Sequence, residues 1–200
     1  MIFHQRRLAF FARLQVSFCL CLLALLFLLP QTTSALQRRP APSAPAFAAQ
    51  GSQTNVADQL LAEAEKLRTA ATPASRREAV EKYKAALLLW QSLGDRRKEA
   101  TTRNGLCSVY NRLGERQVAL GYCEQAVVLR RELKDQAGEA ETLNLIGNIQ
   151  LALHGPLAAL DYFQRSLALR RALGDRRGIV VTLGNLSGLY SQTGEAEKEL

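Results

Sequence analysis

The sequence predicts an all-α solenoid of antiparallel helix pairs, and two observations lead to that prediction. From residue 56 onward the chain matches itself without a gap when it is shifted by 40 residues. Within each 40-residue step, apolar residues recur at helical spacing. A fixed period of this size is typical of stacked supersecondary units. Aligned triplets include Ala79/Ala119/Ala159, Leu89/Leu129/Leu169, Leu93/Leu133/Leu173, Asp95/Asp135/Asp175 and Thr102/Thr142/Thr182.

Turn residues divide each step into two helices. Gly94 and Gly174 stand where a left-handed C-cap is favoured, and Lys134 takes that place in the middle step. Asp95 and Asp175 follow as N-caps of the next helix. We expect helices at about 56–71, 75–93, 96–113, 116–133, 136–153, 156–173 and 176–193, and no strand. The solenoid then spans residues 56–200, with pairs at 56–93, 96–133 and 136–173 and an incomplete pair at 176–200.

The N-terminal leader has the pattern of an export signal. Three arginines precede the uncharged run 16–29, and small residues offer a cleavage site after Ala35. A spanning helix needs about 20 apolar residues, so we expect residues 1–35 to be a signal peptide and the chain to be periplasmic or extracellular. An uncleaved anchor over residues 8–29, which would be the membrane contact, and a buried helix of a soluble domain remain alternatives.

Residues 36–55 are expected to form a disordered linker between the leader and the solenoid. Proline, alanine, serine and glutamine dominate this stretch, and it holds three of the chain's six prolines. Such a composition buries too little apolar surface to fold, and proline keeps it extended.

Most of the chain's net positive charge lies in its first fifty residues. The net charge of the whole chain is +8, with 26 basic and 18 acidic residues. The first fifty residues hold five of the arginines and no acidic residue, so the charge of residues 51–200 falls to +3. A nucleic-acid-binding domain would need a basic stripe on its folded part, so we expect no nucleic acid partner.

The repeated positions resemble the tetratricopeptide repeat, whose pattern is Leu, a small residue, Tyr, Gly, Ala, an aromatic residue and Ala. In this chain the matching positions are Leu106, Cys107, Tyr110, Gly114, Ala119, Cys123 and Ala126, then Ile146, Gly147, Gln150, His154, Ala159, Phe163 and Ser166. The 40-residue length resembles kinesin light chain repeats, and also exported bacterial proteins in which such repeats precede a caspase-like CHAT peptidase domain. The resemblance covers about residues 58–200 and implies a right-handed solenoid.

The resemblance also implies a binding surface, because the first helix of each tetratricopeptide pair lines a concave groove that holds a peptide or a partner helix. The polar positions that it places there are Asn104, Ser108, Asn111, Asn144 and Asn148, followed by Gly184 and Gly188. An asparagine amide both donates to and accepts from a peptide backbone. The alternative is that these residues are merely exposed.

Several arginines could attract acidic partners. They are Arg103, Arg112, the pair Arg130 and Arg131, and the pair Arg170 and Arg171. Because the two pairs recur at the 40-residue spacing, we expect them on solvated ridges rather than in the groove.

The two cysteines of the solenoid occupy positions that face each other inside one repeat of the family. Cys107 takes the small-residue position and Cys123 the aromatic one. We expect two buried thiols that act as small hydrophobic residues. A disulfide is the alternative, and an exported location would permit it.

The sequence predicts no catalytic residue, metal site or cofactor site. His4 lies in the leader and His154 in a turn, and no phosphate-binding glycine loop, metal-ligand cluster or nucleophile elbow occurs. We therefore expect a non-enzymatic scaffold whose partner is a protein or peptide. The alternative is the recognition arm of a larger exported CHAT-type peptidase, with its catalytic domain beyond Leu200.

The last residues continue the repeat pattern part-way. Residues 194–200 have the pattern of a starting helix, and Leu200 aligns with Leu120 and Leu160. Each unit of a solenoid exposes its apolar face to the next, so helix 176–193 needs a cover. We expect either further repeats or a downstream domain in a longer protein, or a docking face for another chain.

Overall fold

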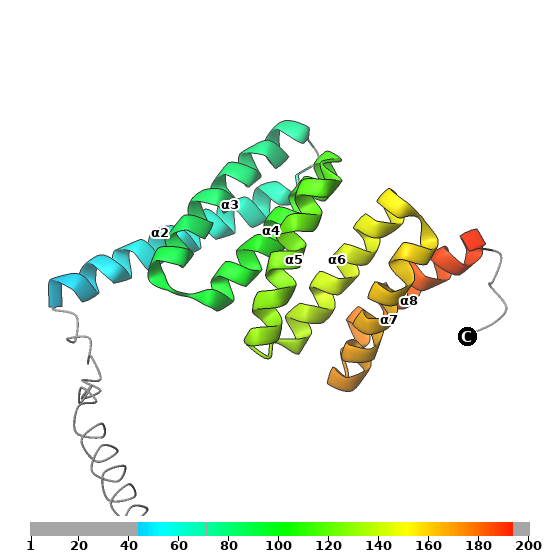
Figure 1. Cartoon of the computed structure of the whole chain (residues 1–200). Helices are drawn as coiled ribbons and strands as arrows, with labels where there is room; N and C mark the ends of the chain where they lie inside the picture. Colours follow the sequence, from blue (N-terminus) through cyan, green and yellow to red (C-terminus); the bar gives the residue numbers. More distant parts are fainter. Residues whose placement is uncertain (1–43, 71, 194–200) are drawn as a thin grey trace, which may run out of the picture. The chain divides into compact units, whose positions relative to one another are not determined.

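The computed structural model describes residues 44–70 and 72–193, and every regular element in these two ranges is an α-helix (Figure 1). The helices follow one another as antiparallel neighbours along the solenoid. Their bounds are α2 Ala44–Arg68, α3 Pro73–Leu93, α4 Arg96–Leu113, α5 Arg116–Glu132, α6 Gln136–His154, α7 Pro156–Leu173 and α8 Arg176–Thr193. The prediction of an all-α solenoid of helix pairs is confirmed.

The predicted helix boundaries agree with the structure to within two residues, apart from the two ends of α2. Helix α3 begins at Pro73 rather than at residue 75, because Thr72 caps it and accepts a hydrogen bond from Ser75 N at 3.1 Å. The predicted signal peptide and residues 36–43 of the predicted linker lie outside the described residues. Among the helices that are described, none is long and apolar enough to cross a membrane.

The second part of the predicted linker is helical, which corrects the expectation of disorder over residues 44–55. Helix α2 starts at Ala44. Pro45 lies in its first turn, where the missing N–H costs nothing, and the alanines that follow are strong helix formers. The first buried residue is Ala57, which is fully enclosed. The packed part of the solenoid thus begins where the sequence predicts, although the helix begins earlier.

Capping side chains fix the start of the first helix of each later pair. Asp95, Asp135 and Asp175 accept hydrogen bonds from the backbone N–H three residues on, at 2.9, 3.1 and 2.9 Å. The residue before each aspartate has a positive φ: 72° at Gly94, 55° at Lys134 and 68° at Gly174. This left-handed residue turns the chain between helices, and it sets the same geometry at every 40-residue step.

The helices pack mainly on their neighbours in the sequence, and the first helices α2, α4, α6 and α8 also contact one another in series. The largest fully buried side chains include Trp90, Tyr83 and Phe163. Tyr83 lies against Gly105, where an added Cβ would come within 2.5 Å of the tyrosine ring. Phe163 lies against Gly147 in the same way, at 2.6 Å. Glycine in the facing helix therefore makes room for each of these rings.

Helices α4 and α5 are joined by a covalent bond instead. Cys107 and Cys123 form a disulfide with a Cα–Cα distance of 5.4 Å, and both residues are fully buried. The facing positions are those that the family resemblance implies, but the pairing differs from the two free thiols that we expected. An antiparallel helix pair brings the two Cβ atoms within disulfide reach.

Candidate protein-binding groove

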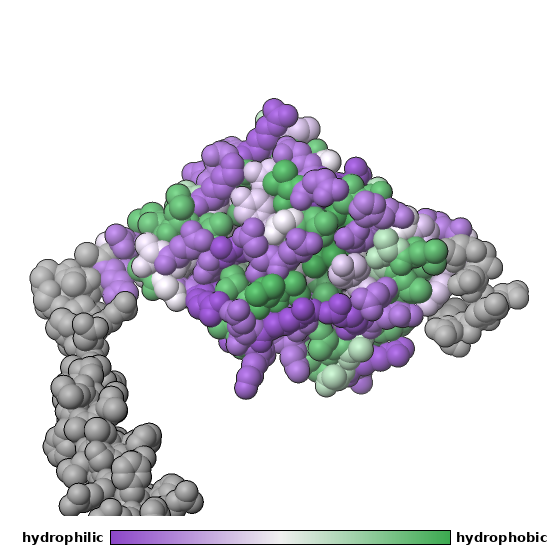
Figure 2. Space-filling view, in the orientation of Figure 1, coloured by the Kyte–Doolittle hydropathy of each residue, from purple (hydrophilic) through white to green (hydrophobic). Residues whose placement is uncertain are grey.

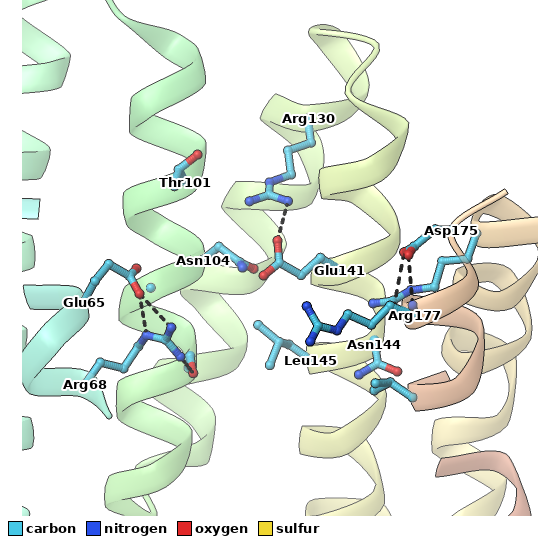
Figure 3. A pocket seen from close by; sticks show the side chains of 15 residues that line it. Glu65, Arg68, Thr101, Asn104, Arg130, Glu141, Asn144, Leu145, Asp175 and Arg177 are labelled. Carbon is cyan, nitrogen blue, oxygen red and sulfur yellow. Dashed lines mark hydrogen bonds and ion pairs between the residues drawn. The ribbon is translucent and has the colours of Figure 1, made fainter. Parts of the chain in front are cut away.

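A cavity of about 450 Å³ runs across the first helices of the solenoid. Its lining comes from α2, α4, α6 and α8, together with one arginine each from the ends of α5 and α7 (Figure 3). The lining residues are Glu65, Arg68, Thr101, Asn104, Gly105, Ser108, Arg130, Glu141, Asn144, Leu145, Arg170, Asp175, Arg177, Gly178 and Val181. This is the face on which the sequence places a groove.

Three of the five predicted groove residues line this cavity. Asn104, Ser108 and Asn144 belong to it, whereas Asn111 and Asn148 are half-buried outside its lining. Both residues lie further along their helices, towards the C-terminal ends. The lining also leaves out Gly184 and Gly188, which are exposed on α8. The groove is therefore shorter along the helix axes than predicted.

The two asparagines that line the groove are engaged between repeats. Thr142 Oγ1 lies 3.1 Å from Asn104 Oδ1, and Thr182 Oγ1 lies 3.4 Å from Asn144 Oδ1. Asn185 Nδ2 donates to the same Asn144 oxygen at 3.0 Å. Asn104 is 6% exposed and Asn144 is 7% exposed. Their oxygens thus join successive first helices, and only their remaining polar atoms are left for a ligand.

The exposed row of the groove lies three residues earlier on each first helix, at Thr101, Glu141 and Val181. All three line the cavity and are exposed, and the Glu141 side chain retains 58% of its accessible surface. The prediction from the sequence missed this row because it selected mainly asparagines. The sequence did contain a signal for this row: the three positions follow the 40-residue spacing, but the residue type differs in every repeat.

Arg130 and Arg170 are buried, which corrects the expectation that both lie on solvated ridges. They are 4% and 8% exposed, whereas Arg131 and Arg171 are exposed. Each buried guanidinium lies over a glycine at the start of the next helix, Gly138 or Gly178. A Cβ on either glycine would come within 2.2 Å of an arginine nitrogen. The glycine opens the space that the arginine fills.

Charged groups alternate along the groove. At the α2 end, Arg68 donates to Glu65 Oε2 through Nε and Nη2 at 2.9 and 2.6 Å, and Tyr83 donates to Glu65 Oε1 at 2.7 Å. Burial and the hydrogen bond to Glu65 raise the pKa of Tyr83. Further along, Arg130 Nη1 lies 3.2 Å from Glu141 Oε2 (Figure 3). The groove thus contains charged side chains that are paired with one another, and other charged side chains that form no ion pair within the described residues.

Within residues 44–70 and 72–193, no group of three or more histidine, cysteine or acidic residues could hold a metal ion. His154 is exposed at the last position of α6 and is not part of the cavity lining. On the face shown in Figure 2, polar residues predominate and hydrophobic residues form several smaller areas between them.

A family model described as "Tetratricopeptide repeat" matches residues 98–172. Residues 98–172 are thus similar to tetratricopeptide repeats. The match spans the helix pairs α4–α5 and α6–α7 and confirms the resemblance on which the groove prediction rests. A solved structure with a similar fold is BtubC (BKLC) from P. vanneervenii, which is 20% identical. That comparison covers 74% of this chain and 69% of the other, with a TM-score of 0.47. Among curated proteins, none matches.

Proposed function

We propose that this tetratricopeptide array is a non-catalytic scaffold that binds an extended segment of a partner protein in its groove. The observation that carries the proposal is the cavity lined by all four first helices, with an exposed residue of the row 101, 141 and 181 on each of the last three. Tetratricopeptide repeats are generally protein-interaction modules, and the groove lies where such modules place their ligands.

The chemistry of the lining favours a peptide as the ligand. A cavity for a small organic ligand is largely apolar and encloses most of its occupant. This one has a polar and charged lining along most of its length, with Leu145 and Val181 as aliphatic contacts. An extended peptide presents backbone N–H and C=O groups along its whole length. The Asn104 Nδ2 group can donate to a peptide carbonyl, and the Ser108 hydroxyl can bond to either group.

The test is to select peptides from a displayed random library against the full chain in a non-ionic detergent, and then to block the groove. We expect Glu141→Trp to weaken the selected peptides about tenfold or more, equivalent to about 1.4 kcal/mol, because the indole fills the cavity. Gln164→Trp is the matched control, since Gln164 is exposed on α7 and does not line the cavity. Loss of binding in the control, with binding retained in Glu141→Trp, would place the ligand on another face.

We also propose that residues 1–35 direct export of the array. The support is the charged start, the uncharged run 16–29 and the small residues before position 36. When the chain is produced with its leader in a bacterium that exports proteins, N-terminal sequencing should find a new end at Leu36. Recovery of the intact N-terminus in the membrane fraction would favour the anchor over residues 8–29, and in the cytoplasm it would refute export.

A further inference from the structure

We propose that Cys107 and Cys123 are the substrate of a thiol–disulfide exchange reaction that follows export and comes before the α4–α5 pair packs into the solenoid. The partner in this reaction is an exported protein with a reactive disulfide, which acts as the oxidant. The inference rests on the proposed export by residues 1–35. Three observations carry it: the bond is buried, its two ends lie close in the sequence, and residues 36–200 hold no other cysteine.

The bond is shielded from solvent in the folded solenoid. Both cysteines are 0% exposed, and they belong to a hydrophobic cluster that also contains Tyr83 of α3 and Ile146 of α6. In thiol–disulfide exchange a thiolate attacks a sulfur directly, so the rate depends on access to that sulfur. A protein oxidant cannot reach a sulfur that is enclosed in this cluster. The two cysteines must therefore react before the cluster closes around them.

The two cysteines can meet in an early, local structure. They are separated by 16 residues, and the turn at Gly114 and Glu115 lies midway between them. Because a loop of ten residues closes in roughly 10–100 ns, the two thiols of an unfolded chain meet often. The α4–α5 hairpin then holds their Cα atoms 5.4 Å apart, within the range of a disulfide. This step needs no contact with more distant parts of the sequence.

The α4–α5 pair depends on this bond for a contact that the next pair makes with a large side chain. At the equivalent facing positions of α6–α7, the Phe163 ring packs against Gly147. In α4–α5 both facing side chains are small, so less apolar surface is buried there when the thiols are free. We therefore expect the reduced chain to remain open at α4–α5 much of the time, and the pair to close fully only after oxidation.

The number of cysteines makes the pairing unique once the leader is removed. The sequence holds four cysteines, which are Cys19, Cys21, Cys107 and Cys123. Four thiols allow three fully paired arrangements. Cleavage after Ala35 removes the first two cysteines, and residues 36–200 then allow one pairing only. An oxidant is therefore sufficient for this part of the chain, and no disulfide isomerase is required.

The reaction takes place in two exchange steps. The thiolate of one cysteine attacks the disulfide of the oxidant, which forms a mixed disulfide and releases the second sulfur of the oxidant as a thiolate. The thiolate of the other cysteine then attacks the chain's own sulfur in the mixed disulfide. This step forms the Cys107–Cys123 bond and releases the oxidant as a dithiol. The chain loses two protons and two electrons, and the oxidant gains them.

The partner is tested by trapping the mixed disulfide. The chain is produced with its leader in a bacterium that exports proteins, as Cys107→Ser and as Cys123→Ser. Each variant retains one solenoid thiol, so the second step cannot occur, and we expect a covalent complex with an exported protein that a reductant dissolves. The matched control is Cys107→Ser/Cys123→Ser, which should form no such complex although it keeps both leader cysteines. The trap does not require a folded variant, because the first step comes before folding.

The order of events is tested on the purified full chain in a non-ionic detergent, with Cys19→Ser and Cys21→Ser so that only the solenoid pair reacts. Dithiothreitol should reduce the native bond at least about a hundredfold more slowly than the bond of the urea-unfolded chain, because the solenoid must open first. The reduced chain under native conditions should react with oxidised glutathione within about tenfold of its rate in urea, because the α4–α5 pair is open.

The proposed oxidant is refuted if neither single-cysteine variant forms a covalent complex while N-terminal sequencing finds the new end at Leu36. The proposed order is refuted if the thiols of the reduced chain are shielded as strongly as the native bond, because the pair would then pack without the disulfide. Recovery of the intact leader in the cytoplasm would instead refute export, and the exported partner with it. The rates measured on the purified chain do not depend on export, so the two failures can be told apart.

Discussion

The α4–α5 pair and the α6–α7 pair have the same backbone plan but hold their two helices together by different chemistry. At the closest facing positions, α4–α5 uses the Cys107–Cys123 disulfide, whereas α6–α7 places the Phe163 ring against Gly147. All four residues are buried. A bond between two small side chains and a large ring on a glycine fill comparable space, so the repeat constrains the sum of the two side chains rather than either residue alone.

The same two pairs differ again at their ends. Helix α5 is followed by Lys134 in the left-handed position and helix α7 by Gly174. The buried arginine of α5 is met by Glu141, and that of α7 has Val181 in the equivalent place. Each of these differences leaves the backbone unchanged and alters the contribution of a local contact to the free energy of unfolding. Substitutions that exchange these solutions therefore measure what each one contributes.

The largest effect is expected from Phe163→Ala. The ring is fully buried between α6 and α7, and its removal leaves a cavity that the rigid glycine backbone cannot fill. Truncation of a buried phenylalanine costs about 3–5 kcal/mol, and urea unfolding of the full chain followed by circular dichroism will measure the loss. Gln164→Ala, on the exposed side of the same helix, should change stability by less than about 0.5 kcal/mol. A small loss at Phe163 would mean that the α6–α7 contact is held elsewhere.

Removal of the disulfide is expected to be the next largest effect. The two cysteines are separated by 16 residues, and closing a loop of about that length stabilises a fold by about 3 kcal/mol. The Cys107→Ala/Cys123→Ala variant should lose that amount in urea unfolding, and a reductant should destabilise the native chain but not the variant. Alkylation with and without reductant, followed by mass spectrometry, shows whether the two thiols are paired. Ready alkylation of both residues without reductant would contradict the disulfide.

The repeat itself was predictable because it depends on spacing, and the contacts between repeats were not, because they depend on which atoms meet. The period of 40 residues, the apolar spacing and the capping aspartates located most helix ends from the sequence. The same 40-residue period led to a wrong prediction of exposure for Arg130 and Arg170. Their recurrence suggested a solvated ridge, but the glycine that receives each arginine lies eight residues on, in another helix. Of the predicted asparagines, Asn104 and Asn144 line the cavity, but the threonine that binds each of these two was visible only in three dimensions.

A smaller effect is expected where the α4–α5 pair meets α6. Thr142→Val keeps the shape of the side chain but removes the hydroxyl next to Asn104 Oδ1, leaving that buried oxygen without its partner at 3.1 Å. An unsatisfied buried acceptor costs about 1–3 kcal/mol, which a shift of the urea midpoint will reveal. Thr101→Val, on the exposed row of α4, is the matched control and should be nearly neutral. Equal effects of the two substitutions would show that a feature common to both sites, the helix propensity of valine or the bond from each threonine to the carbonyl four residues earlier, sets the loss.

The smallest effect is expected to be a gain, and it tests the turn that follows each second helix. Lys134 adopts φ 55°, a left-handed conformation that costs a residue with a Cβ about 1–2 kcal/mol, and its side chain is exposed. Glycine has no such cost there, so Lys134→Gly should raise the free energy of unfolding by about 1 kcal/mol. Gly174→Ala, the reciprocal change at φ 68°, should lower it by a similar amount. If both substitutions lower stability, Lys134 makes a compensating contribution, and the two turns are not equivalent.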